Sequence, residues 1–141
     1  PFTIEEKATG LDNYSQIPGG VPSIEMRFAA LYSQGVRQDL LSLPQWVAQC
    51  CTNPAKLMGL SRKGEITIGY DADLVIFDPE ANRTLSLDSL HELADWTPYD
   101  GLKIQGWPQI TLSRGKIVVQ DGGFFGEKGN GRFVHRTKAN S

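Results

Sequence analysis

The pattern of hydrophobic and polar positions changes its period near residue 60. Before that point, apolar residues recur at helical spacing between segments that are polar or rich in Gly and Pro. After it, short apolar runs alternate with Gly and Asp turns, which is typical of strands joined by tight connections. The chain is therefore predicted to be α+β, with helices in residues 1–60 and strands in residues 61–141.

The first part of the chain predicts a loop followed by a helix. Residues 1–20 are polar and interrupted by Gly and Pro, so we expect a loop with one helical turn over residues 3–8. Ser23 has a side chain that favours the N-cap position, and a helix should follow it. Its buried face would combine four residues at spacings of four, three and four: Ile24, Phe28, Leu31 and Gly35.

Two more helices are expected before residue 60. Residues 42–45, Ser-Leu-Pro-Gln, form a capping box in which the Ser and Gln side chains each accept from a free backbone N–H. Asn53 and Pro54 would start a third, short helix that ends at Gly59. The helix between them should bury four residues: Trp46, Val47, Cys50 and Cys51.

Residues 63–79 predict two strands around a polar turn. Residues 65–68 alternate polar and apolar side chains, and residues 69–73 form the turn, because Gly permits positive φ and Asp can bond to its own backbone. Residues 74–77 are a continuous apolar run, typical of a strand buried on both faces. Pro79 should end this strand because it has no N–H to donate.

The rest of the chain predicts further strands. Residues 110–113 and 116–119 are apolar runs around a Gly turn, so they should pair as a hairpin. Asp121-Gly122 begins a second turn. From residue 126 the chain is polar and rich in Gly, and we expect it to lie over another surface or to fray.

Composition and charge limit the kinds of partner. A formal net charge of −2 is too small to indicate a polyanionic or membrane partner. From residue 114 onward the chain carries six Lys or Arg and two acids, but it lacks the interleaved aromatic residues of a nucleic-acid interface. No apolar run is long enough to span a membrane, and no signal peptide is visible. We expect a cytoplasmic protein that binds neither nucleic acid nor membrane.

Candidate catalytic and metal-binding residues are few. His91 and His135 are far apart, and neither belongs to a His-x-His motif or a cluster at ligand spacing. Asp71 and Asp73 offer oxygen ligands for a hard cation, but two ligands in a turn favour a structural role instead. Glu25 is interpreted as a charge on a helix surface. The residues by themselves assign no reaction.

Several motifs nevertheless resemble one known family. The segment 63–79 contains G-x-I-x-x-G-x-D-A-D-L-V-I-x-D, which is similar to the C-terminal region of the amidohydrolase superfamily of metal-dependent hydrolases. The DADLV motif alone would identify only the superfamily. The later run GWPQITLSRGKIVVQDGGFFGEKGNGRF narrows the resemblance to cyclic amidases like dihydropyrimidinase and D-hydantoinase, with allantoinase close. Other matching runs are IPGGVPSIEMR, NPAKLMGL and WTPYDG.

The resemblance implies a fold and an activity. Residues 1–60 would supply the last loop and outer helices of a (β/α)8 barrel, and residues 61–141 part of a small β-sandwich. The implied reaction is hydrolysis of cyclic amide C–N bonds with zinc or another divalent metal in the full-length enzyme. A barrel takes about 250 residues, so this chain should be a C-terminal segment that holds no metal and is not catalytic on its own. Pro1-Phe2 resembles the end of the family motif that carries the last metal ligand.

One substrate contact of the family maps onto this chain. Such enzymes hold the substrate ring partly through backbone groups of an Asn in a Pro-Asn-Gly loop, and the matching residues here are Pro18, Gly19 and Gly20. Gly19 is therefore the candidate substrate-binding residue, through its backbone, with a plain turn before a helix as the alternative. The change from Asn to Gly leaves the substrate open. The implied partners are an upstream barrel segment of the same enzyme and further copies of the chain, since the family forms tetramers.

Two alternative functions stay open. Some relatives of dihydropyrimidinase have lost the metal ligands and serve as scaffolds, so the chain could be a non-catalytic structural or oligomerisation module. It could also belong to an allantoinase, although the run that ends in DGGFFG favours the hydantoinase branch.

Overall fold

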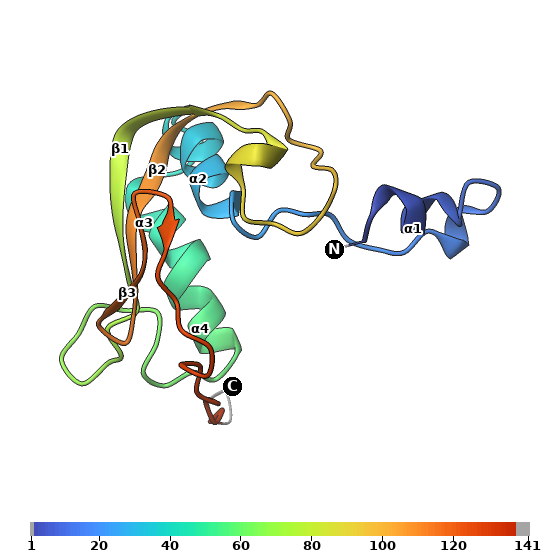
Figure 1. Cartoon of the computed structure of the whole chain (residues 1–141). Helices are drawn as coiled ribbons and strands as arrows, with labels where there is room; N and C mark the ends of the chain where they lie inside the picture. Colours follow the sequence, from blue (N-terminus) through green and yellow to red (C-terminus); the bar gives the residue numbers. More distant parts are fainter. Residues whose placement is uncertain (1, 138–141) are drawn as a thin grey trace.

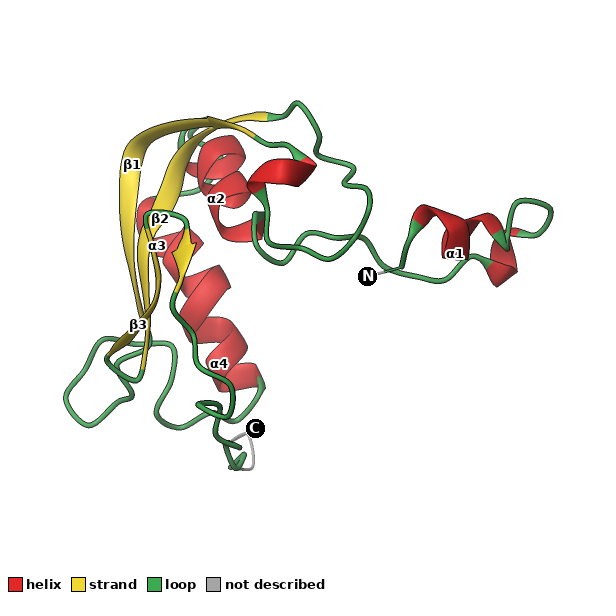
Figure 2. Ribbon diagram, in the orientation of Figure 1, coloured by secondary structure: helices red, strands yellow, loops and turns green. Residues whose placement is uncertain are grey.

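A computed structural model describes residues 2–137 and shows a four-stranded antiparallel sheet covered by helices on one side (Figure 1). The strands lie side by side in chain order: β1 Leu74–Thr84, β2 Lys103–Ser113, β3 Lys116–Gln120 and β4 Gly123–Phe124. Residues 2–17 extend away from this unit as an arm that carries α1 and the 3-10 turn η1 (Figure 2). The α+β prediction is confirmed.

Two of the α-helices begin at capping boxes. Thr3 and Glu6 form a capping box at the first helix, and Ser42 and Gln45 form another at the predicted position. The α-helices are α1 Ile4–Ala8, α2 Arg27–Leu31, α3 Leu43–Val47 and α4 Asn53–Leu57; the π-helical turns are η2 Tyr32–Val36 and η3 Ala48–Thr52; the 3-10 turns are η1 Tyr14–Gln16 and η4 Leu87–Ser89.

Helix α2 differs from its prediction in its start and in the face that it buries. The side chain of Ser23 makes no cap at this helix, whose first α-helical residue is Arg27. Ile24 is 85% exposed, whereas Met26 and Ala29 are buried. The predicted face is therefore wrong at Ile24 and at Leu31, which is 38% exposed, because the sheet meets the helix from the side of Met26 and Ala29.

Residues 43–57 form one continuous helical rod where two helices were expected. The N–H of Asn53 donates to the carbonyl of Ala48, so one turn of the rod is π-helical. This wider turn accommodates Pro54, which has no N–H and would clash with a carbonyl four residues back in a regular α-helix. The rod ends at Gly59, as predicted, where φ is +67°.

Trp46 joins the rod to the rest of the protein. It is 3% exposed, and its ring centroid lies 4.2 Å from that of Phe28 and 5.1 Å from that of Phe77. Its indole N–H donates to the carbonyl oxygen of Phe28 at 3.1 Å. The prediction that this helix face is buried holds for Trp46 but is wrong for Val47, which is 41% exposed, while both cysteines are half-buried.

Strand β1 is longer and less buried than predicted. It continues past Pro79 because its pairing with β2 shifts between Asp78 and Asn82, so the irregular stretch needs no N–H from the proline. Val75 and Ile76 are 45% and 50% exposed. The prediction of a strand buried on both faces is therefore wrong, since the helices cover only one face of the sheet (Figure 2).

Residues 65–68 form no strand, contrary to the alternation of their side chains. Ile66 and Ile68 are 91% and 103% exposed. An alternating pattern becomes a strand only where a neighbouring strand accepts its hydrogen bonds, and the part of the chain that the structure describes places no strand beside these residues.

The two predicted hairpin turns are confirmed. Arg114 and Gly115 join β2 to β3 with φ of 47° and 78°, and Asp121 and Gly122 join β3 to β4 with φ of 49° and 80°. Positive φ at both central residues matches the right-handed twist of the strands that each turn connects.

The hydrophobic core forms between α2 and the long hairpin of β1 and β2. Its buried members are Met26, Ala29, Leu85, Leu90, Ile104 and Trp107. They come from both predicted segments, residues 1–60 and residues 61–141, and the division of the chain near residue 60 stays a prediction.

The N-terminal end of the arm is attached to the loop between η4 and β2. Asp95 accepts from the N–H of Ile4 at 3.0 Å, and Trp96 donates to the carbonyl of Phe2 at 2.8 Å.

Candidate functional site

The loop that carries Gly19 is exposed between the arm and α2. The Lys7 ammonium donates to the carbonyl of Pro18 at 2.8 Å, which fixes the loop against the arm. A Cβ atom added to Gly19 would meet no heavy atom within 4 Å, and Gly20 has a φ of +100°. The backbone of Gly19 is thus accessible to a bound molecule, and its role as a substrate contact stays a prediction.

Glu25 and His91 form a carboxylate–imidazole pair although they are 66 residues apart. Oε1 of Glu25 lies 2.7 Å from Nδ1 of His91, and Oε2 accepts from the His91 backbone N–H at 2.6 Å. On the other side of the ring, Nε2 lies 3.2 Å from the carbonyl oxygen of Gly122. The hydrogen bond and the charge of Glu25 raise the pKa of His91, because both ring nitrogens face acceptors that favour the imidazolium form.

This pair borders a largely apolar cavity of about 370 Å³ between the segment before α2 and the loop after η4. Val21, Ile24 and Leu93 supply apolar walls. The cavity offers the His91 imidazole and two carboxylates, Glu25 and Glu92, but within residues 2–137 no three His, Cys, Asp or Glu side chains come together in an arrangement that could hold a metal ion. The sequence interpretation of Glu25 as a plain surface charge missed this pair, since neither periodicity nor spacing links it to His91.

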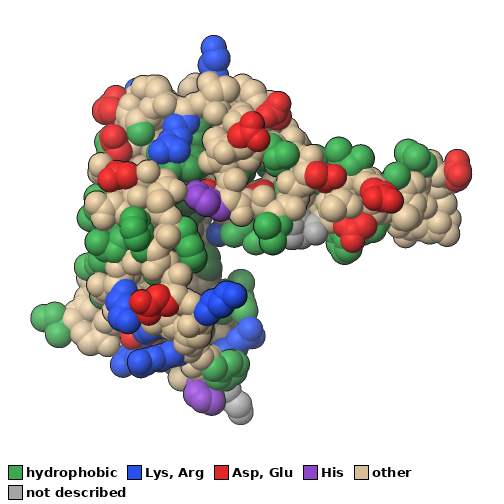
Figure 3. Space-filling view, viewed as in Figure 1, with side chains coloured by type: hydrophobic (Ala, Val, Ile, Leu, Met, Phe, Trp, Pro, Cys, Tyr) green, Lys and Arg blue, Asp and Glu red, His purple; other side chains and the backbone are tan. Residues whose placement is uncertain are grey.

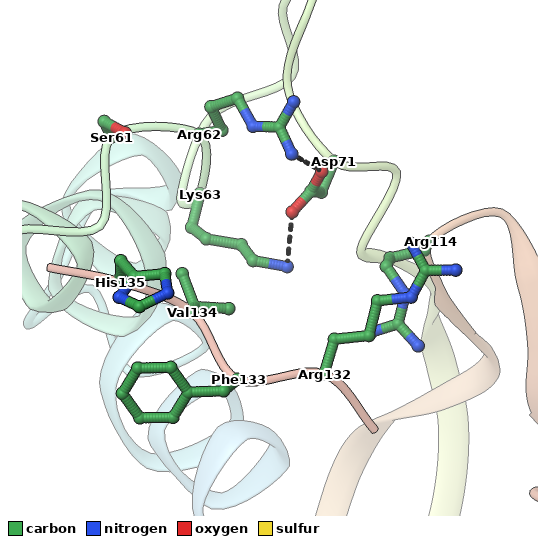
Figure 4. Close-up of a pocket in the computed structure, with 9 residues that line it drawn as sticks. All are labelled: Ser61, Arg62, Lys63, Asp71, Arg114, Arg132, Phe133, Val134 and His135. Atoms are coloured by element: carbon green, nitrogen blue, oxygen red, sulfur yellow. Dashed lines mark hydrogen bonds and ion pairs between the residues drawn. The ribbon is translucent and has the colours of Figure 1, made fainter. Parts of the chain in front are cut away.

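Asp71 and Asp73 are neutralised by cations of their own chain. The Lys63 ammonium lies 2.9 Å from Oδ2 of Asp71, and Arg62 pairs with Asp71 at 3.0 Å (Figure 4). Lys63 also pairs with Asp73. The hydrogen bond from Lys63 lowers the pKa of Asp71. Partial burial opposes the charge of Lys63, yet hydrogen bonds to Asp73 and Asp71 outweigh it and raise the pKa of the lysine. The turn therefore has a structural role, as the sequence favoured.

The remaining candidates offer no nucleophile or ligand cluster. Burial raises the pKa of the Cys50 and Cys51 thiols, which keeps both protonated and weakly nucleophilic. His135 lies in the C-terminal tail, where its ring packs edge-on against Phe133 with 5.0 Å between centroids. In the described part of the chain, no helix has the length and apolar character needed to cross a membrane.

Comparison with protein families matches residues 7–118 to the amidohydrolase family. Among curated proteins, the D-hydantoinase of Geobacillus stearothermophilus is 42% identical over 134 residues, which cover 94% of this chain and 28% of that protein. The dihydropyrimidinase-related protein 5 of Homo sapiens is 37% identical and is matched over 94% of this chain and 24% of its own length.

Solved structures show the same relationship. The crystal structure of dihydropyrimidinase from Brevibacillus agri superposes with a TM-score of 0.95 at 40% sequence identity. The match covers all of this chain and 31% of that one. The chain therefore spans less than a third of the length of these relatives.

Proposed function

Since this chain belongs to the amidohydrolase family, we propose that it is the C-terminal part of a metal-dependent hydrolase of cyclic amide C–N bonds, of the hydantoin or dihydropyrimidine type. One observation carries the proposal: sequence and fold agree along the whole chain with proteins named D-hydantoinase and dihydropyrimidinase. Because the chain spans less than a third of their length, activity belongs to the larger enzyme.

The described residues do not fit a metal centre, because no suitable group of His, Cys, Asp and Glu side chains comes together among them. The proposal therefore assigns zinc, or another divalent metal, to an upstream barrel segment of the same enzyme. When bound there, the metal would supply the activated water. The contribution of this chain is the Gly19 backbone beside the substrate, on a loop that Lys7 holds in place.

Exposed apolar side chains support the need for such a segment. Leu11 and Tyr14 in the arm are 84% and 86% exposed, and Ile66 and Ile68 are exposed in the loop before β1. Figure 3 shows hydrophobic side chains along the arm as well as over the sheet and helices. Apolar surface of this extent marks an interface. We propose that the arm and helices cover the end of a barrel, and that residues 65–68 join a sandwich completed by further strands.

A chimera tests the proposal. The matching C-terminal segment of the Geobacillus D-hydantoinase is replaced by this chain, and hydrolysis of hydantoin, dihydrouracil and allantoin is measured after loading with zinc. We expect turnover of hydantoin or dihydrouracil well above that of free metal, and none by the 141-residue chain alone. A chimera that is folded and metal-loaded yet inactive on all three substrates would contradict the proposal. The same hydrolase without any C-terminal segment is the control.

The role of Gly19 is tested in the same chimera. Gly19→Ala keeps the backbone N–H and places its Cβ in open space, so it should leave KM unchanged. Gly19→Pro removes the N–H and should raise KM if the substrate bonds to it. Equal KM values for the two variants, at equal metal content, would remove Gly19 from the substrate site.

A non-catalytic structural or oligomerisation module is the second candidate function. The wide exposure of apolar side chains favours it, because such a surface promotes self-association. Light scattering should then show oligomers of the isolated chain, and a monomer at high concentration would count against it.

The intact mass of the protein from its native source separates the two candidate functions. A mass near 15.5 kDa favours the module, whereas a mass about as large as the relatives, some threefold greater, favours the cytoplasmic, tetrameric hydrolase.

A further inference from the structure

A second cavity, of about 310 Å³, lies at the end of the protein where the C-terminal tail passes the β2–β3 hairpin tip. Four segments that are distant in the sequence line it: residues 61–63, the turn at Asp71, the tip at Arg114 and tail residues 132–135 (Figure 4). None of these residues belongs to the Gly19 loop or to the Glu25–His91 pair, so the cavity is independent of the proposed hydrolase site.

Positive charge dominates this cavity. Arg62, Lys63, Arg114 and Arg132 line it, and Asp71 is the one carboxylate among the lining residues. Asp71 forms ion pairs with Arg62 and Lys63, and the neighbouring Asp73 forms one with Lys63. Figure 3 shows the wider trend, with Lys and Arg gathered on the lower part of the visible face and most acids on the upper part and the arm.

Two arginines make no side-chain ion pair among the described residues, although the backbone N–H of Arg114 donates to Asp73 at 2.8 Å. Within residues 2–137, neither Arg114 nor Arg132 lies at ion-pair distance from an acid. Figure 4 shows both side chains on the same side of the cavity. The guanidinium of Arg114 donates to the carbonyl of Asn130, which holds the tail near the hairpin tip and still leaves other N–H groups of the fork free.

These features match the needs of a doubly charged oxyanion. Two guanidinium forks can each donate a pair of hydrogen bonds to phosphate oxygens, and an anion between them removes their mutual repulsion. Phe133 and Val134 add apolar side chains to the lining and are 84% and 41% exposed, so the site is open to solvent. The cavity volume suits a small ligand. We propose that this cavity binds a small phosphate-bearing anion, with Arg114 and Arg132 as its principal contacts.

Binding would also fasten the tail to the sheet, because the two arginines come from different segments. The tail is already held at its far end by the N–H of Thr137, which donates to the carbonyl of Gly59 at 2.9 Å. A bound anion adds a second attachment near residue 132. We therefore expect the ligand to raise the melting temperature and to slow proteolysis within residues 126–137.

The test is a titration of the purified 141-residue chain with inorganic phosphate, pyrophosphate and succinate, followed by calorimetry and by thermal melting. Sodium chloride at matched ionic strength is the reference. We expect saturable binding of pyrophosphate and phosphate, weaker binding of succinate, and no saturable effect of chloride.

Vesicles that contain phosphatidic acid test whether the phosphate could belong to a lipid. We expect no binding to these vesicles, because the net charge of the chain is −2.

Matched variants locate the site. Arg132→Gln and Arg114→Gln should each weaken pyrophosphate binding about tenfold, the usual effect of losing one hydrogen-bonded charge partner. Lys128→Gln removes the same charge from the same tail outside the cavity lining, and it should leave the affinity unchanged. Equal losses in all three variants would overturn the proposal. So would a wild-type chain that responds to phosphate and pyrophosphate no more than to chloride, whatever the stability of the variants.

Discussion

Helices α1 and α3 begin with the same local signal and end in different surroundings. Thr3 and Glu6 close a capping box at α1, as Ser42 and Gln45 do at α3, but α1 ends after five residues whereas α3 continues into the rod of residues 43–57. Helix α1 buries no residue, whereas α3 buries Trp46. The comparison separates what starts a helix from what keeps it in place.

The energies explain the difference. A capping side chain is worth about 1 kcal/mol, and a helix as short as α1 is marginal in water on its own. Burial of a Trp among other aromatic rings contributes several times more. Helix α3 therefore belongs to the unit that should unfold cooperatively, while α1 depends on local hydrogen bonds and on the contacts at the base of the arm.

The strongest test removes the packing that distinguishes α3. Trp46→Ala should lower the free energy of unfolding by about 3–5 kcal/mol, because it empties a space lined by Phe28, Tyr32 and Phe77. Urea denaturation followed by circular dichroism measures the change. Ile4→Ala, at a 58% exposed position in α1, is the control and should change the same free energy by less than about 0.5 kcal/mol. Comparable losses would mean that the arm unfolds together with the core.

The next test concerns how closely the sheet approaches the helices. Gly106 has a φ of +94°, and a Cβ atom there would lie 2.4 Å from Cδ1 of Tyr32. Gly106→Ala should therefore cost about 2–4 kcal/mol, from backbone strain and from overlap together. Gly101→Ala is matched for strain, with φ +75° and open space around its Cβ, and should cost about 1 kcal/mol. Equal effects in chemical denaturation would rule out the close approach.

Removing the two capping hydroxyls compares the helices directly. Ser42→Ala should lower the global free energy of unfolding by about 1 kcal/mol. Thr3→Ala removes an equivalent cap, but it should change only the local stability of α1, because α1 is not part of the core. Hydrogen exchange at the backbone amides of Glu6 and Lys7 should then become faster while the urea midpoint stays constant. A shifted midpoint would contradict the separation between arm and core.

The smallest expected effect is a pH dependence in the loop that anchors the arm. The raised pKa of His91 means that its stabilising contribution is complete below the unfolded value of about 6.5 and is lost as pH rises through the folded pKa. The pair is partly exposed, so the change should stay below about 1 kcal/mol. Denaturation at about pH 5.5 and about pH 8.5 measures it.

Glu25→Gln is the control for the pH dependence, because it removes the charge that raises the pKa of His91. This variant should show a flatter profile over the same range. An unchanged profile would assign the pH dependence to other groups.

Much of the local structure could be predicted from the chain. The capping box at residues 42–45, the stop at Gly59 and both hairpin turns all depend on residues within a few positions of one another. The family resemblance was also readable from short motifs, and the amidohydrolase match over residues 7–118 confirms it.

Other features depended on contacts that no local pattern reveals. Residues 65–68 alternate like a strand but have no strand beside them among the described residues, while β1 continues through Pro79 because its partner accommodates a bulge. The Glu25–His91 pair and the cavity at Arg114 and Arg132 join segments that are far apart in the chain. The Gly19 loop was located by resemblance alone.

By itself, the sequence determined the helix start at the Ser42 capping box, the hairpin turns, the α+β class and the family, because each follows from short-range hydrogen bonding, backbone freedom or a continuous motif. Only the tertiary structure decided which faces are buried, where β1 ends and which charges meet. Burial and charge pairing depend on which distant segments come together, and that arrangement is a property of the whole fold. For this reason the alternation at residues 65–68 produced no strand, whereas two arginines 18 positions apart, Arg114 and Arg132, came to line one cavity.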